Sequence, residues 1–281
     1  YGKQIQLTGV DLQLNTRVTA EQLNNGSFDE VVIATGIAPR MPDIEGIDHP
    51  KVLNYLDVIG AKKHVGNKVA IIDLDTHNEV TYAQLDQRAE RLAAWLQGQG
   101  VSKGDRVALL TPNCPEVFEA EFACAKIGAI CIPLNWRLTV PELEYILNDS
   151  TPKVLIFDQT FNEQASALQA LCSFMHTLEV AMENASSSYE LALAGADEKC
   201  QAVECTHDDI AMIMYTSGTT GHPKGAMITF GMNLYNAINL GMPAGVNSNT
   251  VQLVILPLFH TGGMNCYANP IIHAGGQVLL M

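Results

Sequence analysis

The segment from Thr216 to Gly225, TSGTTGHPKG, constrains this chain more than any other part of it. Glycine lets backbone N–H groups approach an anion closely, and the Ser and Thr hydroxyls add further donors. Lys224 supplies a full positive charge, and residues 210–215 form an apolar run that is typical of a buried strand. A strand followed by a donor-rich, cationic loop predicts a binding site for nucleotide phosphates. The residues expected to contact the phosphates are Thr216, Ser217, Gly218, Thr219, Thr220, Gly221 and Lys224.

Two other interpretations of this segment fit less well. The Walker A pattern has glycine directly before the lysine and Ser or Thr directly after it, whereas Pro223 and Gly225 occupy those positions here. A solvated linker has a similar composition, but it needs neither a lysine behind a proline nor a buried strand just upstream. We therefore favour a phosphate-binding loop of another kind.

Several further motifs occur in a fixed order along the chain. Together with the loop they resemble the adenylate-forming enzymes, a family that includes acyl-CoA synthetases, luciferases and the adenylation domains of peptide synthetases. The resemblance covers about residues 71–281, and several motifs in one order are more specific than a single loop. The motifs are TPNCPE at 111–116, AKIGA at 125–129, IPLN at 132–135 and LPLFHTGG at 256–263.

This resemblance implies that a carboxylic acid, such as a fatty acid, is activated with ATP and Mg²⁺. The acid attacks the α-phosphate to give an acyl-adenylate and pyrophosphate, and coenzyme A then displaces AMP. It also implies that His260 stands at the mouth of the acyl pocket and gates the acyl chain or pantetheine. The family's later motifs do not follow Met281, so we assign no catalytic residue and no metal ligand, and we expect an incomplete or chimeric fragment.

The first seventy residues follow another pattern. A strand at residues 29–33 ends in the turn Ala34-Thr35-Gly36, and Pro-Arg and PDIEG segments follow. These residues resemble the flavin domain of NADH-dependent flavin oxidoreductases, in particular the 2,4-dienoyl-CoA reductases. The resemblance implies that Ala34, Thr35 and Gly36 are a remnant of a flavin contact, but no complete FAD or NAD(P) site is encoded, so FAD binding is not expected.

We therefore expect two parts: residues 1–70, a remnant of a flavin- and NAD(P)-binding α/β domain, and residues 71–281, a truncated AMP-binding N-terminal domain. Two alternatives to an acid–CoA ligase remain open: a fragment of a dienoyl-CoA reductase, or a non-functional fusion product.

Hydrophobic periodicity predicts an α/β fold from residue 81 onward. Strands and helices alternate, which favours mainly parallel sheets flanked by helices. Residues 182–206 break this rhythm, and the stretches 184–188 and 197–207 are predicted to be surface connection. Strands are expected at 106–110, 129–134, 153–158, 210–215, 251–256 and 277–281, and helices over 85–98, 115–128, 141–147, 161–174, 230–240 and 263–273.

Composition restricts the partners and the compartment. A net charge of −14 argues against binding to nucleic acids or anionic membranes, while a local cationic loop can still bind ATP. The seven cysteines are scattered without a C-x-x-C pair, which fits a reducing cytoplasm. No apolar run approaches the roughly 20 residues of a membrane-spanning helix. Small-molecule acids and coenzyme A are therefore the expected partners.

Overall fold

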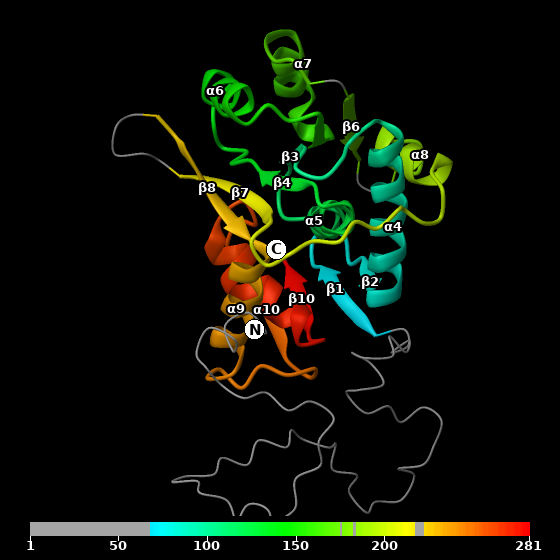
Figure 1. Ribbon diagram of the computed structural model, residues 1–281. Coiled ribbons are helices and arrows are strands. Elements are labelled where there is room, and N and C mark those ends of the chain that lie inside the picture. Colours follow the sequence, from blue (N-terminus) through cyan, green and yellow to red (C-terminus); the bar gives the residue numbers. More distant parts are fainter. Residues whose placement is uncertain (1–67, 175, 182–183, 217–221) are drawn as a thin grey trace, which may run out of the picture. The chain divides into compact units, whose positions relative to one another are not determined.

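The computed structural model describes residues 68–174, 176–181, 184–216 and 222–281. All of the described residues belong to one unit of the chain, residues 66–281 (Figure 1). The strand and turn expected at 29–36 lie outside the described residues.

The larger sheet has six strands in the order β6-β5-β3-β4-β7-β8 (Figure 1). Its first five strands are parallel, and only the edge strand β8 runs antiparallel, to its neighbour β7. The parallel part confirms the strand–helix alternation predicted from the sequence. The strands are β3 (Arg106–Leu110), β4 (Ile130–Pro133), β5 (Val154–Asp158), β6 (His176–Val180), β7 (Ile210–Thr216) and β8 (Lys224–Thr229).

The smaller sheet has four strands in the order β2-β1-β10-β9. β10, the last strand, pairs in parallel with β1, the first strand described, and with β9 on its other side. The sheet thus joins the beginning of the described chain to its end. The short β2 runs antiparallel to β1. The strands are β1 (Val69–Asp73), β2 (Glu79–Thr81), β9 (Val251–Val254) and β10 (Gln277–Leu280).

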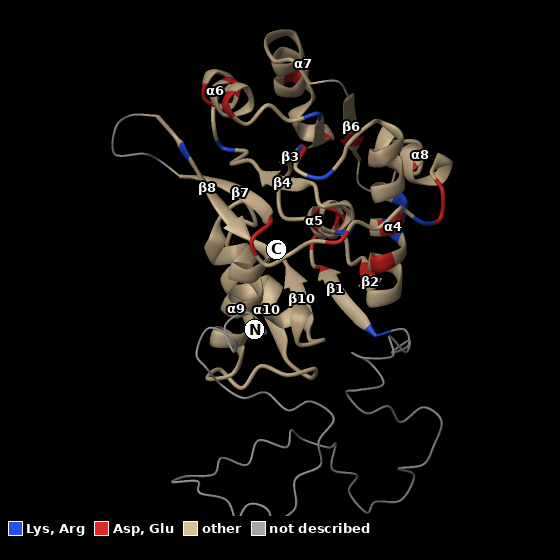
Figure 2. Cartoon of the chain, in the orientation of Figure 1, with Lys and Arg blue, Asp and Glu red and all other residues tan. Residues whose placement is uncertain are grey.

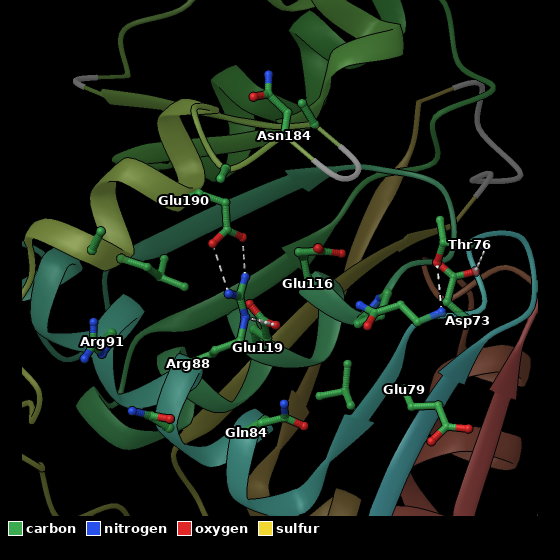
Figure 3. Close-up of a pocket in the computed structure, with 18 residues that line it drawn as sticks. Asp73, Thr76, Glu79, Gln84, Arg88, Arg91, Glu116, Glu119, Asn184 and Glu190 are labelled. Carbon is green, nitrogen blue, oxygen red and sulfur yellow. Dashed lines mark hydrogen bonds and ion pairs between the residues drawn. The ribbon is translucent and has the colours of Figure 1, made fainter.

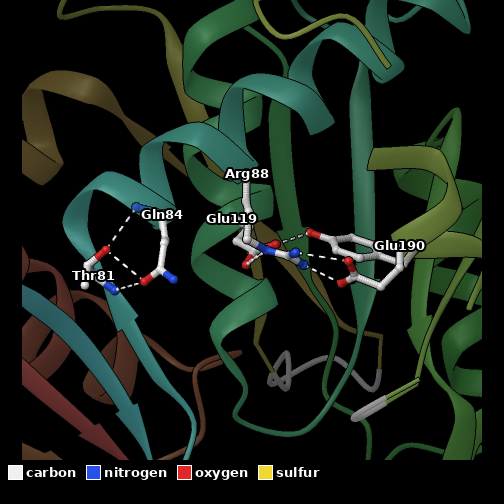
Figure 4. A network of polar contacts seen from close by, with 6 residues as sticks. Thr81, Gln84, Arg88, Glu119 and Glu190 are labelled. Carbon is white, nitrogen blue, oxygen red and sulfur yellow. Dashed lines mark hydrogen bonds and ion pairs between the residues drawn. The ribbon is translucent and has the colours of Figure 1, made fainter. Parts of the chain in front are cut away.

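The helices begin and end close to the predicted positions. The first of them starts at a capping box, in which the Thr81 hydroxyl accepts from the Gln84 N–H and the Gln84 side chain accepts from the Thr81 N–H (Figure 4). The α-helices are α4 (Tyr82–Gly98), α5 (Pro115–Ile127), α6 (Val140–Ser150), α7 (Asn162–Leu171), α8 (Ser188–Gly195), α9 (Phe230–Gly241) and α10 (Asn269–His273); η1 (Gln159–Phe161) is a 3₁₀ turn and η2 (Gly262–Ala268) a π-helix.

Side chains alternate between two hydrophobic clusters along the central strands, as the pleat requires. On β3, Val107 and Leu109 pack into a cluster that contains α4, α5 and residues of both sheets, whereas Ala108 and Leu110 pack against α6 and α7. The helices α4 and α5 therefore lie between the two sheets. None of the helices in the described ranges combines the length and the apolarity that crossing a bilayer requires.

Several elements were not predicted, among them β2, β6, α8 and β8. Helix α8 lies between the two stretches expected to be surface connection, 184–188 and 197–207; Ser187 caps it, and Tyr189 and Leu193 are buried one turn apart. Strand β6 precedes it and extends the parallel sheet. Strand β8 was not predicted, because its sequence KGAMIT carries little strand pattern, and only its first two residues fall in the predicted loop. Pairing with β7 holds it as an edge strand.

Candidate functional site

The carboxyl ends of β3, β4 and β7 lie at one edge of the larger sheet, because these strands are parallel. In such sheets, ligands bind beyond the carboxyl ends of the strands. The segments that follow these strands carry three of the motifs: Asn113 after β3, Asn135 after β4, and Thr216 at the end of β7. This edge is the candidate site.

The predicted phosphate loop connects β7 to β8 at this edge. Thr216 and Lys224 are paired across the two strands, and both are exposed. Neither strand of this hairpin contains an acidic residue (Figure 2), and no carboxylate of the described chain forms an ion pair with Lys224. The lysine charge is therefore available to an anion. Residues 217–221, which include five of the seven expected phosphate contacts, lie outside the described residues.

Helix α6 contacts strand β7 and His222, which lies two residues before β8. The Tyr215 hydroxyl donates to Asp149 Oδ2 at 2.5 Å, and burial together with this bond raises the pKa of Tyr215. The Tyr145 ring stacks on His222, with centroids 4.9 Å apart and 24° between the planes. Gly225 lies opposite Tyr215, and a Cβ there would meet the tyrosine ring at 3.1 Å.

The segment that carries His260 is fixed by backbone and side-chain bonds. The exposed imidazole accepts a hydrogen bond at Nδ1 from the Gly262 N–H at 3.0 Å, so the neutral ring carries its proton on Nε2. Upstream, Asn113 Oδ1 accepts from the Leu258 N–H at 2.9 Å, and its Nδ2 donates to the Leu256 carbonyl at 3.1 Å. The motif around Asn113 was noted from the sequence, but this role was not.

An aromatic cluster connects the segment after β4 to the same histidine segment. Trp136 and Phe259 meet edge to face with centroids 6.4 Å apart. The Arg137 guanidinium lies 4.6 Å from the Trp136 ring centroid and 5.7 Å from that of Phe259. These contacts place the IPLN segment beside the residue that precedes His260.

A separate cavity of about 860 Å³ lies between α4, α5 and α8 (Figure 3). Arg88 projects into it and bridges Glu119, at 2.6 Å from Nε, and Glu190, which it binds through both terminal nitrogens (Figure 4). Burial and the neighbouring Glu119 raise the pKa of Glu116 to about 7. None of the predicted site residues lines this cavity. Because Arg88 is already paired with two carboxylates, we assign the Arg88 network a structural role.

The described residues hold no group of three or more His, Cys, Asp or Glu side chains arranged to bind a metal ion. The expected flavin contacts Ala34, Thr35 and Gly36 lie outside the part of the chain that is described.

Comparison with known proteins identifies the class. Residues 60–281 match the family described as AMP-binding enzyme. Feruloyl-CoA synthase from an Amycolatopsis species is 40% identical over 201 residues, 72% of this chain and 38% of that protein. Long-chain-fatty-acid–CoA ligase FadD13 from Mycobacterium tuberculosis is 38% identical over 195 residues, 69% of this chain and 38% of that protein. The crystal structure of ATP-bound MatB from Rhodopseudomonas palustris has a TM-score of 0.71 at 30% identity, over 80% of this chain and 44% of that one.

The chain therefore belongs to the AMP-binding enzyme family. The match confirms the resemblance to the adenylate-forming enzymes, and the structural relative confirms the α/β fold. The chain spans less than half the length of these relatives.

Proposed function

We propose that this chain forms the ATP-phosphate and acid-binding part of an enzyme that joins a carboxylic acid to coenzyme A. The observation that carries the proposal is the pairing of Thr216 with Lys224 at the carboxyl edge of the sheet, where the lysine has no acidic partner among the described residues. The family match and the ATP-bound structural relative support it.

In the proposed first step, a carboxylate oxygen attacks the α-phosphorus of ATP, the bond to the bridging oxygen breaks, and pyrophosphate leaves with its electron pair. Lys224 and the loop donors stabilise the negative charge that builds up on the departing phosphates. In the second step the thiol of coenzyme A attacks the acyl carbon, AMP leaves, and the thiol proton is lost to solvent. His260 gates access to the acyl pocket in this scheme.

The acid itself is proposed to be hydrophobic. The two named curated relatives act, by their names, on an aromatic acid and on long-chain fatty acids. Residues 225–281, which carry His260, contain no Asp, Glu, Lys or Arg, and such a wall suits an apolar acyl group better than a second charged group.

Isothermal titration of the 281-residue chain with MgATP, MgADP and AMP tests the proposal. We expect affinity to fall in this order, because the loop contacts the terminal phosphates. Equal affinities for the three nucleotides, or no binding to a folded chain, would overturn it.

For the N-terminal residues we keep the proposal made from the sequence, a remnant of a flavin-binding domain over 1–70 that does not bind FAD. The seven cysteines, none of them paired, favour a reducing compartment such as the cytoplasm. Visible absorption of the purified chain tests the first point, since flavin absorbance that survives desalting would contradict it.

A further inference from the structure

A buried carboxyl group lies behind the segment that carries His260. Glu121, on α5, is 9% exposed, and its Oε1 accepts from Asn269 Nδ2 at 2.8 Å. Its second oxygen, Oε2, and the amide oxygen Oδ1 of Asn269 are both buried, and neither has a hydrogen-bond partner in the described part of the chain. Two acceptors without a donor are costly in a protein interior.

The surroundings offer no positive charge to an ionised Glu121. The elements on the far side of Glu121 are α9, η2 and α10, which contain no Lys, Arg or acid. Their one histidine, His273 on α10, is exposed. The titratable groups beside it on α5 and β4 are the thiols of Cys124 and Cys131, which are buried. Burial raises the pKa of Glu121 to about 7, against the smaller opposite effect of the Asn269 bond.

The polar contacts continue from Asn269 toward the histidine. Asn269 Nδ2 also donates to Asn265 Oδ1 at 3.2 Å, and Asn265 Nδ2 donates to Thr261 Oγ1 at 3.3 Å. Asn236 Nδ2, from α9, donates to the Asn265 carbonyl at 2.6 Å. Thr261 directly follows His260. A chain of side chains therefore leads from α5 through the π-helix η2 to the residue next to the proposed gate.

We propose that Glu121 is a positioning residue for the His260 segment: as a neutral carboxylic acid it donates its O–H to Asn269 Oδ1 and so holds η2 against α5. One proton satisfies both unpartnered acceptors and closes the network. Loss of this proton to solvent removes the donor and leaves an uncompensated buried charge, so η2 is held less firmly. The meaning for His260 rests on the proposed function, whereas the protonation of Glu121 does not.

The pH dependence follows from the raised pKa. Between about pH 4.5 and pH 7, Glu121 is protonated in the folded chain and ionised in the unfolded chain. The contribution of this group to the free energy of unfolding therefore falls as the pH rises through that window. Above pH 7 the loss is complete. Replacement by glutamine, which keeps a donor and cannot ionise, is expected to remove the dependence.

Infrared difference spectroscopy tests the protonation on the 281-residue chain. The spectrum of the wild-type chain minus that of Glu121→Gln is expected to show the C=O stretch of a carboxylic acid at pH 6, which disappears with a midpoint near 7. The control Glu204→Gln, an exposed site, should give no such band at pH 6. Absence of the band in the Glu121 difference spectrum would overturn the proposal. If Glu121→Gln does not fold, the assigned carboxyl ¹³C resonance of Glu121 in the wild-type chain decides instead, and a midpoint near the ordinary glutamate value of about 4.3 overturns it.

The positioning role has its own readout in the amide hydrogen exchange of η2, where the Met264 N–H donates to the His260 carbonyl at 3.1 Å. The exchange rate of this amide in the wild type, divided by the rate in Glu121→Gln, is expected to rise about threefold or more between pH 6 and pH 8, because η2 opens locally more often. A ratio that stays constant would overturn the positioning role. MgATP affinity, measured on the same samples, reports separately on the proposed function.

Discussion

The side chain of Asn113 and the backbone of Leu258 join two motifs that lie far apart in the sequence. Asn113 Oδ1 accepts from the Leu258 N–H, while Nδ2 donates to the carbonyls of Leu256 and Met281. One carboxamide thus satisfies three backbone groups. It holds the segment leading to His260 against the end of β3, so the two motifs act as a single structural unit.

Replacing Asn113 by alanine should destabilise the chain. Three backbone groups lose their partner, and we expect the free energy of unfolding to fall by about 1–3 kcal/mol in urea denaturation. Asn148→Ala is the matched control, because that asparagine is exposed on α6 and makes no hydrogen bond through its side chain among the described contacts. Equal stabilities of the two variants would contradict the role given to Asn113.

Gly263 is expected to tolerate no side chain. A Cβ there would lie 2.4 Å from the Pro257 carbonyl oxygen and 2.6 Å from that of Leu256, both backbone atoms. Gly263→Ala should therefore lower the free energy of unfolding by about 1–3 kcal/mol. A loss of this size lowers the melting temperature by several degrees. Gly98→Ala is the control. It has no atom within 4 Å of the added Cβ and lies in a helix, so this variant should be neutral or slightly more stable.

Arg88→Met should destabilise the chain in a pH-dependent way. The substitution leaves the buried Glu119 without its cationic partner, and removal of one member of a buried pair typically costs about 3–5 kcal/mol. Burial raises the pKa of Glu119 while Arg88 lowers it, so loss of the arginine raises it further. At pH 5 the Glu119 side chain of the variant is then protonated and neutral, so the loss of stability should be smaller at pH 5 than at pH 8. Arg91→Met, on the same helix with one 3.9 Å contact to an exposed glutamate, should cost little at either pH; a cost for Arg88→Met that does not change with pH would contradict this account.

Helix α6 is expected to influence nucleotide binding through the hairpin. Tyr145→Ala removes the ring that stacks on His222, and Tyr215→Phe removes the bond to Asp149. Each should weaken MgATP binding several-fold, at a cost of about 1 kcal/mol, and leave AMP binding almost unchanged. Titration calorimetry with both nucleotides measures this. A parallel loss of both affinities would indicate general destabilisation instead.

Much of the fold could be predicted because local signals and tertiary packing agree. Leu85, Ala89, Leu92 and Leu96 recur at helical spacing and are all buried on α4, and Pro115 starts α5 as expected. Strand β8 could not be predicted, since its KGAMIT sequence is mostly exposed and only the pairing with β7 makes it a strand. A helix was predicted over 263–273, but the sequence carries no signal that its first part, η2, is a π-helix.

A candidate site could be proposed from the sequence where chemistry is concentrated in one segment, as in the loop around Lys224. Contacts between distant residues could not be predicted. Neither the bonds of Asn113 to residues 256–258 nor the contact of Glu121 with Asn269 leaves a pattern in the sequence, because each partner alone is an ordinary polar residue. Only the fold brings them together.

The most direct test of the central claim is the affinity of Lys224→Met for MgATP and for AMP, with Lys199→Met, an exposed lysine elsewhere, as the control. We predict that Lys224→Met loses about tenfold or more in MgATP affinity, as expected for a charge-assisted contact, while AMP affinity and the melting temperature stay unchanged. A folded Lys224→Met chain that binds MgATP as tightly as the wild type would contradict the account.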